Sequence, residues 1–419
     1  MMSDLTVLGR GSKQTEMAAQ APEMQQTLMT PVISLNEAQE IVAEYEGDEF
    51  SVTSLVEVGN IGFSYTASRR VYDIALTNAS ARYLLVILPL HSDSEHDSSP
   101  SITNTLQALS ALLTKIASCT NVPVPKPVAQ DSSGGNGRWD FSWLLLLIPR
   151  SSEAPASMST SILSLASLRP TLSPRQLARV ELRLGTYLRA LHGITNEWFG
   201  RPVEEEAEEE NWSKYSWQDT FVLLLEELIG ELCESPSGGS TRFDLREELG
   251  IDVEELRRYL SRAIGSYLFD DVESPGLMWV TGSEADVLVS LSEKEGTEIE
   301  DEIGAEADIA YLLPTFSHAL WGDPLMESWF VPPGPSEAIN EGYFGGEGSL
   351  IVFPRQKTKR VWYTIYLALL VLMEERRGGK IGQRETIGHG EDNTGRSKVQ
   401  WAREILPKCV KALKDAPYY

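Results

Sequence analysis

The sequence predicts an α+β fold with two lobes, in which a small antiparallel β lobe precedes a large and mainly helical lobe. Between Ser51 and Leu90 the chain holds short runs of β-branched and aromatic residues separated by turn signals, a pattern typical of antiparallel strands. After about residue 150, apolar residues recur at helical spacing instead. The lobes are expected to meet near residues 149–155, with any ligand pocket in the cleft between them.

The predicted β lobe comprises residues 34–150. It begins with a helix over 34–48, where Ser34 and Glu37 have the spacing of a capping box. A second helix is expected over 102–118, because its leucines and isoleucine recur at helical spacing. The expected strands are 51–58, 62–68, 69–76, 82–90 and 141–149.

The predicted helical lobe comprises residues 151–419. Its expected helices are 174–193, 217–233, 251–268, 358–377 and 398–414, and two short strands are expected at 277–282 and 286–291. Residues 1–33 are polar and rich in Gln, and they are expected to form a disordered leader.

The charge balance excludes several classes of partner. The chain has 419 residues, with 36 Lys and Arg against 61 Asp and Glu, which gives a net charge of −25. Nucleic acid and anionic membranes are therefore not expected partners, because both require clustered basic residues. A triphosphate would bind only in a strongly basic local site, which must overcome the background field.

The cysteines and the longest apolar run point to a cytoplasmic protein. Cys119, Cys233 and Cys409 are far apart in the sequence, and neither a disulfide framework nor a zinc site is expected from them. The apolar run 361–373 is shorter than the ~20 residues that span a bilayer. It is expected to form a buried core helix, and no secretory signal is recognised at the N-terminus.

Six stretches, taken in their order along the chain, resemble one known family. They are RVYDI (70–74), NVPVPKPV (121–128), LGTYLRALHGITNEWFG (184–200), SWQDTFVLLLEELI (216–229), ALWGDPLMESWF (319–330) and KRVWYTIYLALLVLMEERR (359–377). Together they resemble the aminoglycoside-phosphotransferase-like (choline-kinase-like) family, in its fungal branch. The resemblance implies a two-lobed protein-kinase-like fold whose cleft holds the phosphoryl-transfer machinery.

Several parts of that machinery are missing from this sequence. Such kinases use a strand lysine for the phosphates, a helix glutamate that orients the lysine, and two aspartates for the substrate proton and Mg²⁺. Val86 stands at the lysine position, and residues 101–118 contain no acid. Ser283 stands where the resemblance places the catalytic aspartate, and Thr315 stands at the metal position.

Neighbouring acidic residues offer replacements for the two aspartates. Glu284 or Asp286 could take the catalytic role, and Asp308 could bind the metal. The loop that covers the nucleotide also departs from the family, because residues 66–69 lack its glycine, although Gly59 and Gly62 lie upstream. No replacement for the lysine or the helix glutamate is found, so the sequence predicts a degenerate member, a pseudokinase without bound nucleotide or metal cofactor.

Three hypotheses of function follow from these losses. In the first, the cleft binds an apolar small molecule and transforms it by cyclisation, isomerisation or dehydration, as a step in fungal secondary metabolism. Its candidate catalytic residues are Glu284, Asp286, His318 and Asp323, since a carboxyl group in an apolar pocket can act as a general acid and a histidine as a base. Whether the chain is an enzyme stays open at this point.

In the second hypothesis the chain is a non-catalytic protein that binds a small molecule or serves as a scaffold for a protein partner. Exposed tryptophans would favour it, because tryptophan is frequent at interfaces. In the third hypothesis the chain is an active ATP-dependent kinase of small molecules whose catalytic residues have migrated to other positions.

Overall fold

The computed structural model describes most of the two lobes. The described residues are 32–47, 50–77, 82–90, 102–148, 162–202, 215–233, 243–292, 306–345, 353–378 and 398–416. Most of the predicted leader and the whole predicted lobe boundary, residues 149–155, fall outside these ranges.

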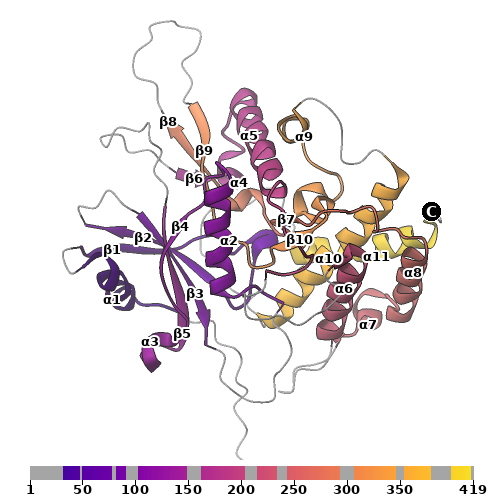
Figure 1. The fold of residues 1–419 in the computed structure, drawn as a ribbon, viewed down its shortest axis with the longest axis horizontal. Helices are drawn as coiled ribbons and strands as arrows, with labels where there is room; N and C mark the ends of the chain where they lie inside the picture. Colours follow the sequence, from indigo (N-terminus) through magenta and orange to yellow (C-terminus); the bar gives the residue numbers. More distant parts are fainter. Residues whose placement is uncertain are drawn as a thin grey trace, which may run out of the picture.

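The first lobe is built on a five-stranded antiparallel sheet, which lies on the left of Figure 1. Its strands, in spatial order, are β1 (Val52–Glu57), β2 (Arg70–Leu76), β3 (Arg82–Pro89), β5 (Phe141–Leu147) and β4 (Lys126–Asp131). In the central strand β3, Val86 lies opposite Val71 on one side and Leu144 on the other. This position is therefore in the middle of the sheet.

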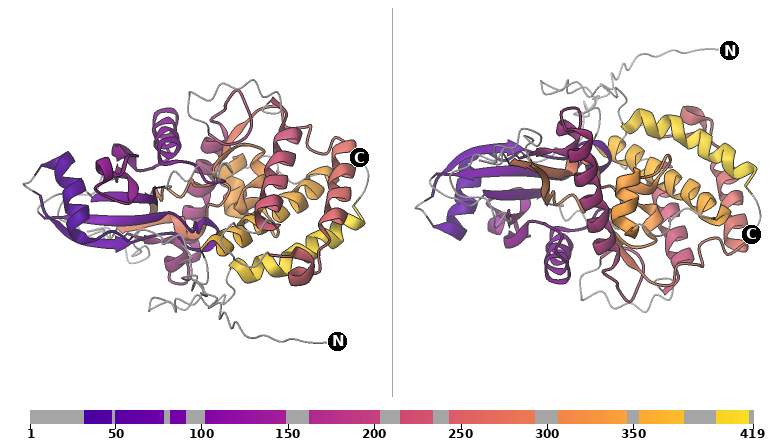
Figure 2. Two further views of the ribbon diagram at one scale, coloured as in Figure 1. Left: turned by 90° about the horizontal axis from the view of Figure 1, so that it is seen from below. Right: turned by 90° about the horizontal axis from the view of Figure 1, so that it is seen from above.

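The two faces of this sheet are covered by different helices. Helix α1 (Leu35–Glu46) begins with the predicted capping box, and its Ile41 and Val42 join a buried cluster with Leu85 and Ile87 of β3. Helix α2 (Leu106–Cys119) covers the opposite face, where alternate β3 residues point. Figure 2 shows the sheet nearly edge-on, with α1 far from the helical lobe.

The second lobe contains the longer helices and five short strands. Its helices are α4 (Leu165–Leu168), α5 (Pro174–His192), α6 (Trp217–Cys233), α7 (Leu245–Leu249), α8 (Val253–Gly265), α9 (Glu337–Phe344), α10 (Pro354–Arg377) and α11 (Lys398–Lys414). Its strands are β6 (Ile162–Ser164), β7 (Gly276–Met278), β8 (Val287–Ser292), β9 (Glu306–Leu312) and β10 (Leu320–Gly322).

Helix α10 is the central helix of the second lobe. Its residues Trp362–Glu374 are all buried, and it packs against α6 and α11. This confirms that the apolar run 361–373 is a core helix. Within the described residues, no helix is long and apolar enough to cross a membrane.

The element order confirms the fold class that the sequence predicts: a small antiparallel β lobe and a large helical lobe in a kinase-like arrangement. One expectation about local structure is wrong. Residues 62–68 do not form a strand; they contain the short 3₁₀ turn η1 (Gly62–Ser64) and pack against the helical lobe. The four-residue helix α3 (Gly134–Gly137) lies between β4 and β5.

Candidate functional site

The lysine position of the resembled family is filled by a buried apolar side chain. Val86 has no exposed surface, and neither does its neighbour Leu144. Both belong to a buried cluster that continues through Leu113 of α2 to Leu188 of α5 and Leu312 of β9. Because one cluster includes residues of both lobes, apolar packing joins the lobes at this point. We call it the apolar half of the inter-lobe contact.

The turn that would carry the catalytic aspartate is tightly packed. Gly282 donates its N–H to the carbonyl of Trp279, and a Cβ on Gly282 would lie 2.5 Å from the Trp279 ring. The short turn η3 (Glu284–Asp286) follows, with Ser283 as its N-cap residue. A glycine is therefore required at 282, and the turn directs Asp286 into the protein rather than toward solvent.

Asp286 is fully buried and receives three hydrogen bonds. Its Oδ2 accepts the Ser283 N–H at 2.9 Å and the Ser283 hydroxyl at 2.6 Å. Its Oδ1 accepts the hydroxyl of Ser64, from the first lobe, at 2.8 Å. Burial raises the pKa of Asp286 to about 6, although the bonds from Ser283 and Ser64 lower it in part.

Ser64 belongs to the connection between β1 and β2, residues 58–69, which we call the crossing segment. In the resembled family this connection is the loop that covers the nucleotide. Here it leaves the sheet and contacts the helical lobe: the Phe63 ring packs edge-to-face on Trp401 of α11, with centroids 4.9 Å apart. The Ala67 N–H donates to Glu374 of α10 at 2.7 Å.

A cluster of buried polar groups lies beneath the end of the crossing segment. Arg69 donates to the carbonyl of Asn104, which precedes α2. His318 Nε2 lies 3.3 Å from Glu374 Oε1. Burial lowers the pKa of Arg69 to about 10, and the nearby Glu374 carboxylate opposes this change.

These groups are incompletely paired. Among the described residues, Arg69 Nε and Nη1, His318 Nδ1 and Asn104 Oδ1 are buried without a hydrogen bond, whereas His318 Nε2 and Glu374 Oε1 face each other at 3.3 Å. Burial would raise the pKa of Glu374, but His318 and Arg377 outweigh it and lower that pKa. The crossing segment and this cluster form the polar half of the inter-lobe contact.

The four candidate catalytic residues do not share one site. Glu284 points away from Asp286 and pairs with Arg169 at 2.7 Å. Asp323 is the N-cap of the turn η4 (Pro324–Met326), and its other oxygen accepts the Lys359 ammonium of α10 at 2.7 Å. Asp286 and His318 are linked only indirectly, because Ser64 of the crossing segment bonds Asp286 and Ala67 of the same segment bonds Glu374, which faces His318.

The proposed replacement for the metal ligand also has another partner. Asp308 of β9 lies 3.5 Å from Arg183 of α5. Thr315 is buried, and its carbonyl accepts the indole N–H of Trp279 at 3.1 Å. The described residues contain no cluster of three or more His, Cys, Asp or Glu side chains that could hold a metal ion.

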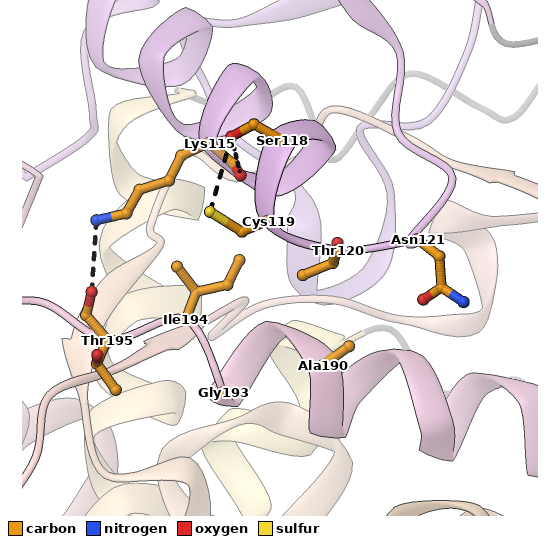
Figure 3. Close-up of a pocket in the computed structure, with 9 residues that line it drawn as sticks. All are labelled: Lys115, Ser118, Cys119, Thr120, Asn121, Ala190, Gly193, Ile194 and Thr195. Atoms are coloured by element: carbon orange, nitrogen blue, oxygen red, sulfur yellow. Dashed lines mark hydrogen bonds between the residues drawn. The ribbon is translucent and has the colours of Figure 1, made fainter.

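A groove of about 750 Å³ lies on another part of the molecule, at the ends of α2 and α5. Lys115, Cys119 and Thr120 line one side, and Ala190 and Gly193 line the other. Figure 3 shows Lys115 reaching across it to the carbonyl of Thr195, at 3.4 Å. None of the four candidate residues lines this groove.

Comparisons with known proteins return likenesses of fold only. No protein-family model matches the chain, and no curated protein matches it. A putative fructosamine-3-kinase from Thermobifida fusca is similar at a TM-score of 0.48 and 14% identity, over 91% of this chain and 100% of that one.

Two further solved structures are similar to the same degree. A choline/ethanolamine kinase family protein from Mesorhizobium loti has a TM-score of 0.46 and 14% identity, over 91% of this chain and 95% of its own. A putative aminoglycoside phosphotransferase from Ralstonia eutropha has a TM-score of 0.46 and 12% identity, over 90% and 98%. The activity of this chain does not follow from likenesses of this size.

Several residues of the polar half do not stand out in the sequence. Ser64, Arg69 and Asn104 fall in no recognisable motif. Glu374 begins the charged run that ends α10, and such a run is usually solvated. One signal was present: Glu374 lies four and seven positions after the buried Leu370 and Leu367, which places it on the same buried side of the helix.

Proposed function

We propose that this chain is a pseudokinase: a protein of kinase-like fold, from a degenerate branch of the resembled family, that binds a partner rather than transferring phosphate. The observation that carries the proposal is the bond between Ser64 and Asp286. It closes the chain on itself where nucleotide and substrate would meet in an active relative.

The electrostatics of the inter-lobe contact support this proposal. A bound triphosphate needs cations, and Val86 offers none. The buried carboxyls of Asp286 and Glu374 lie on the same side of the crossing segment. They would repel phosphate, and the chain as a whole carries a charge of −25. Arg69 and Arg377 are cations near this point, and the Glu374 carboxylate partly neutralises both.

A nucleotide-binding assay tests the proposal. We expect that millimolar ATP, with or without Mg²⁺, leaves the thermal unfolding midpoint unchanged, because a ligand raises it only by binding the folded state. We also expect no ATP hydrolysis and no phosphate transfer to small-molecule acceptors. The matched control is Asp286→Ala, which should behave like the wild-type chain toward ATP.

The active-kinase alternative makes the opposite prediction. A saturable, Mg²⁺-dependent ATP shift that Asp286→Ala abolishes would show that Asp286 has taken over a kinase role and would refute the pseudokinase proposal. An ATP shift that Asp286→Ala leaves intact would also refute it, and would direct attention to Asp308.

A second candidate function is a non-kinase enzyme that acts on an apolar small molecule of fungal secondary metabolism. One observation favours it: a buried carboxyl with a pKa near 6, as at Asp286, can donate a proton near neutral pH. The test incubates the chain with polyketide and terpenoid intermediates and analyses the products. Product formation should be lost in Asp286→Asn and kept in the control Glu284→Gln; loss in neither variant would exclude Asp286 as the acid.

A further inference from the structure

The crossing segment is longer than a connection between its two strands needs to be. Strands β1 and β2 are antiparallel neighbours, and such strands are usually joined by two to five residues. Here residues 58–69 join them. Gly59, Asn60 and Gly62 have positive φ values of 67°, 57° and 69°, a conformation that turns the chain away from the sheet.

Residues 63–67 of the crossing segment contact the helical lobe at three points. Ser64 bonds Asp286, the Ala67 N–H bonds Glu374, and Phe63 packs on Trp401. The Lys398 ammonium also lies 4.1 Å from the centre of the Phe63 ring. These contacts come from a few groups of the segment, whereas the apolar half around Val86 joins the lobes over many buried side chains; Val58, where the segment begins, packs against that cluster.

When the crossing segment is docked, several polar groups are buried without full hydrogen bonding. Arg69 Nε and Nη1 and His318 Nδ1 are buried without hydrogen bonds in the docked state, and Asp286 is held where its charged form is disfavoured. An unpaired buried polar group costs its full desolvation penalty. Undocking would hydrate these groups, so the cost of losing the three contacts is partly offset.

We propose that the crossing segment is a latch, which undocks from α10 and α11 while the two lobes stay packed, and thereby opens the Asp286 and Glu374 site to solvent. The flexible points are the residues with positive φ, where the segment leaves the sheet. The inference goes beyond the pseudokinase proposal, because it describes how any ligand would reach this site.

Hydrogen–deuterium exchange of the whole chain tests the latch. The measured quantity is the exchange of the peptide covering the crossing segment, with the Ala67 amide as the most informative position, against the peptide of β3 (Arg82–Pro89) as reference. We expect the crossing segment to exchange at least about a hundredfold faster than β3, because it opens locally. Exchange of both peptides at one common rate would mean that the segment opens only on global unfolding, and would overturn the proposal.

Substitutions locate the contact that holds the latch closed. Phe63→Ala should accelerate exchange of the crossing segment roughly tenfold and leave β3 unchanged, because it removes the ring that packs on Trp401. The matched control is Ile61→Ala in the same segment, whose side chain is 58% exposed; it should change exchange less than about twofold.

A further variant, Ser64→Ala, tests the proposal in case Phe63→Ala does not fold. If Phe63→Ala does not fold, Ser64→Ala, which removes only the hydroxyl that bonds Asp286, should accelerate exchange of the crossing segment and not of β3. Unchanged exchange in a folded Phe63→Ala chain, or in its replacement Ser64→Ala, would overturn the latch. Equal acceleration of β3 would do the same, since it would show a loss of global stability.

Discussion

The two halves of the inter-lobe contact differ in how completely their buried groups find packing or hydrogen-bond partners. In the apolar half, Val86, Leu144 and Leu113 have no exposed surface and belong to one cluster with residues of the helical lobe. In the polar half, the crossing segment covers buried charged groups, several of whose atoms lack hydrogen bonds. Both halves join the same two lobes across the same region.

Because of this difference, we expect the apolar half to control global unfolding and the polar half to control access of solvent to the buried charged groups. Apolar packing gains free energy wherever water is excluded, so the apolar half is expected to hold until the whole protein unfolds. A buried polar network that is only partly paired gains much less, so the polar half is expected to open first. The first three predictions below change one half by substitution or by pH and give the expected free energy of unfolding or peptide exchange. The fourth changes a residue outside both halves.

The largest effect is expected where a charge enters the apolar half. Val86→Lys introduces the side chain that the resembled family places there, but within a cluster of buried apolar side chains. It should lower the free energy of unfolding at pH 7 on the order of 5 kcal/mol, without creating ATP binding. Denaturant unfolding measures this, and Val86→Ile, which keeps the apolar character, is the control. Wild-type stability combined with ATP binding would show that the cleft had kept its kinase function.

Removing packing from the same half should cost somewhat less. Leu113→Ala takes a fully buried side chain out of α2 and should lower the free energy of unfolding by about 3 kcal/mol, because a cavity remains. Exchange of β3 should then rise, whereas exchange of the crossing segment, which opens locally, should rise much less. An equal rise in both peptides would mean that the crossing segment opens only when the whole protein unfolds.

The polar half should respond to pH. The pKa of Asp286 rises from 3.8 to about 6 on folding, so the folded state binds this proton more tightly. Its stabilising contribution is complete below pH 4 and is lost as the pH rises through 6, about 3 kcal/mol in total. Denaturant unfolding between pH 4 and pH 8 should show this fall in the wild-type chain, and a smaller fall in Asp286→Asn. Identical pH profiles would argue against a raised pKa at this position.

The smallest effect is expected at a candidate residue outside both halves. Glu284 pairs with Arg169, and both side chains are partly exposed, at 32% and 40%. Glu284→Gln should lower the free energy of unfolding by less than about 1 kcal/mol and leave exchange of the crossing segment unchanged. A tenfold change in that exchange would mean that Glu284 controls the latch, despite its separate partner.

The sequence predicts the lobes and most elements because periodicity is a local property. The strands around Val86 and the core helix with Trp362 follow from runs of apolar residues that are visible without any tertiary information. Residues 62–68 show the limit of this reasoning. Phe63, Tyr65 and Thr66 have strand-like composition, but Phe63 finds its partner at Trp401, and contacts so distant in sequence override local preference.

The sequence indicates the candidate site only as far as the resemblance reaches. The resemblance states which residues to expect at the positions of Val86, Ser283 and Thr315, and this chain differs from it at each. The environment of Asp286 could not be predicted, because its partner Ser64 lies in the other lobe. For His318 the same is true of Glu374, since no spacing in the sequence indicates that two such distant residues become neighbours.

The contact between Phe63 and Trp401 also has a consequence for biosynthesis. On the ribosome the strands of the first lobe emerge long before α11 does. At about 5–20 residues per second, the chain between the two rings takes roughly 20–70 s to make. Throughout that interval the Phe63 ring lacks its partner at Trp401. A nascent chain would thus expose this ring to chaperones and proteases until α11 has emerged from the ribosome.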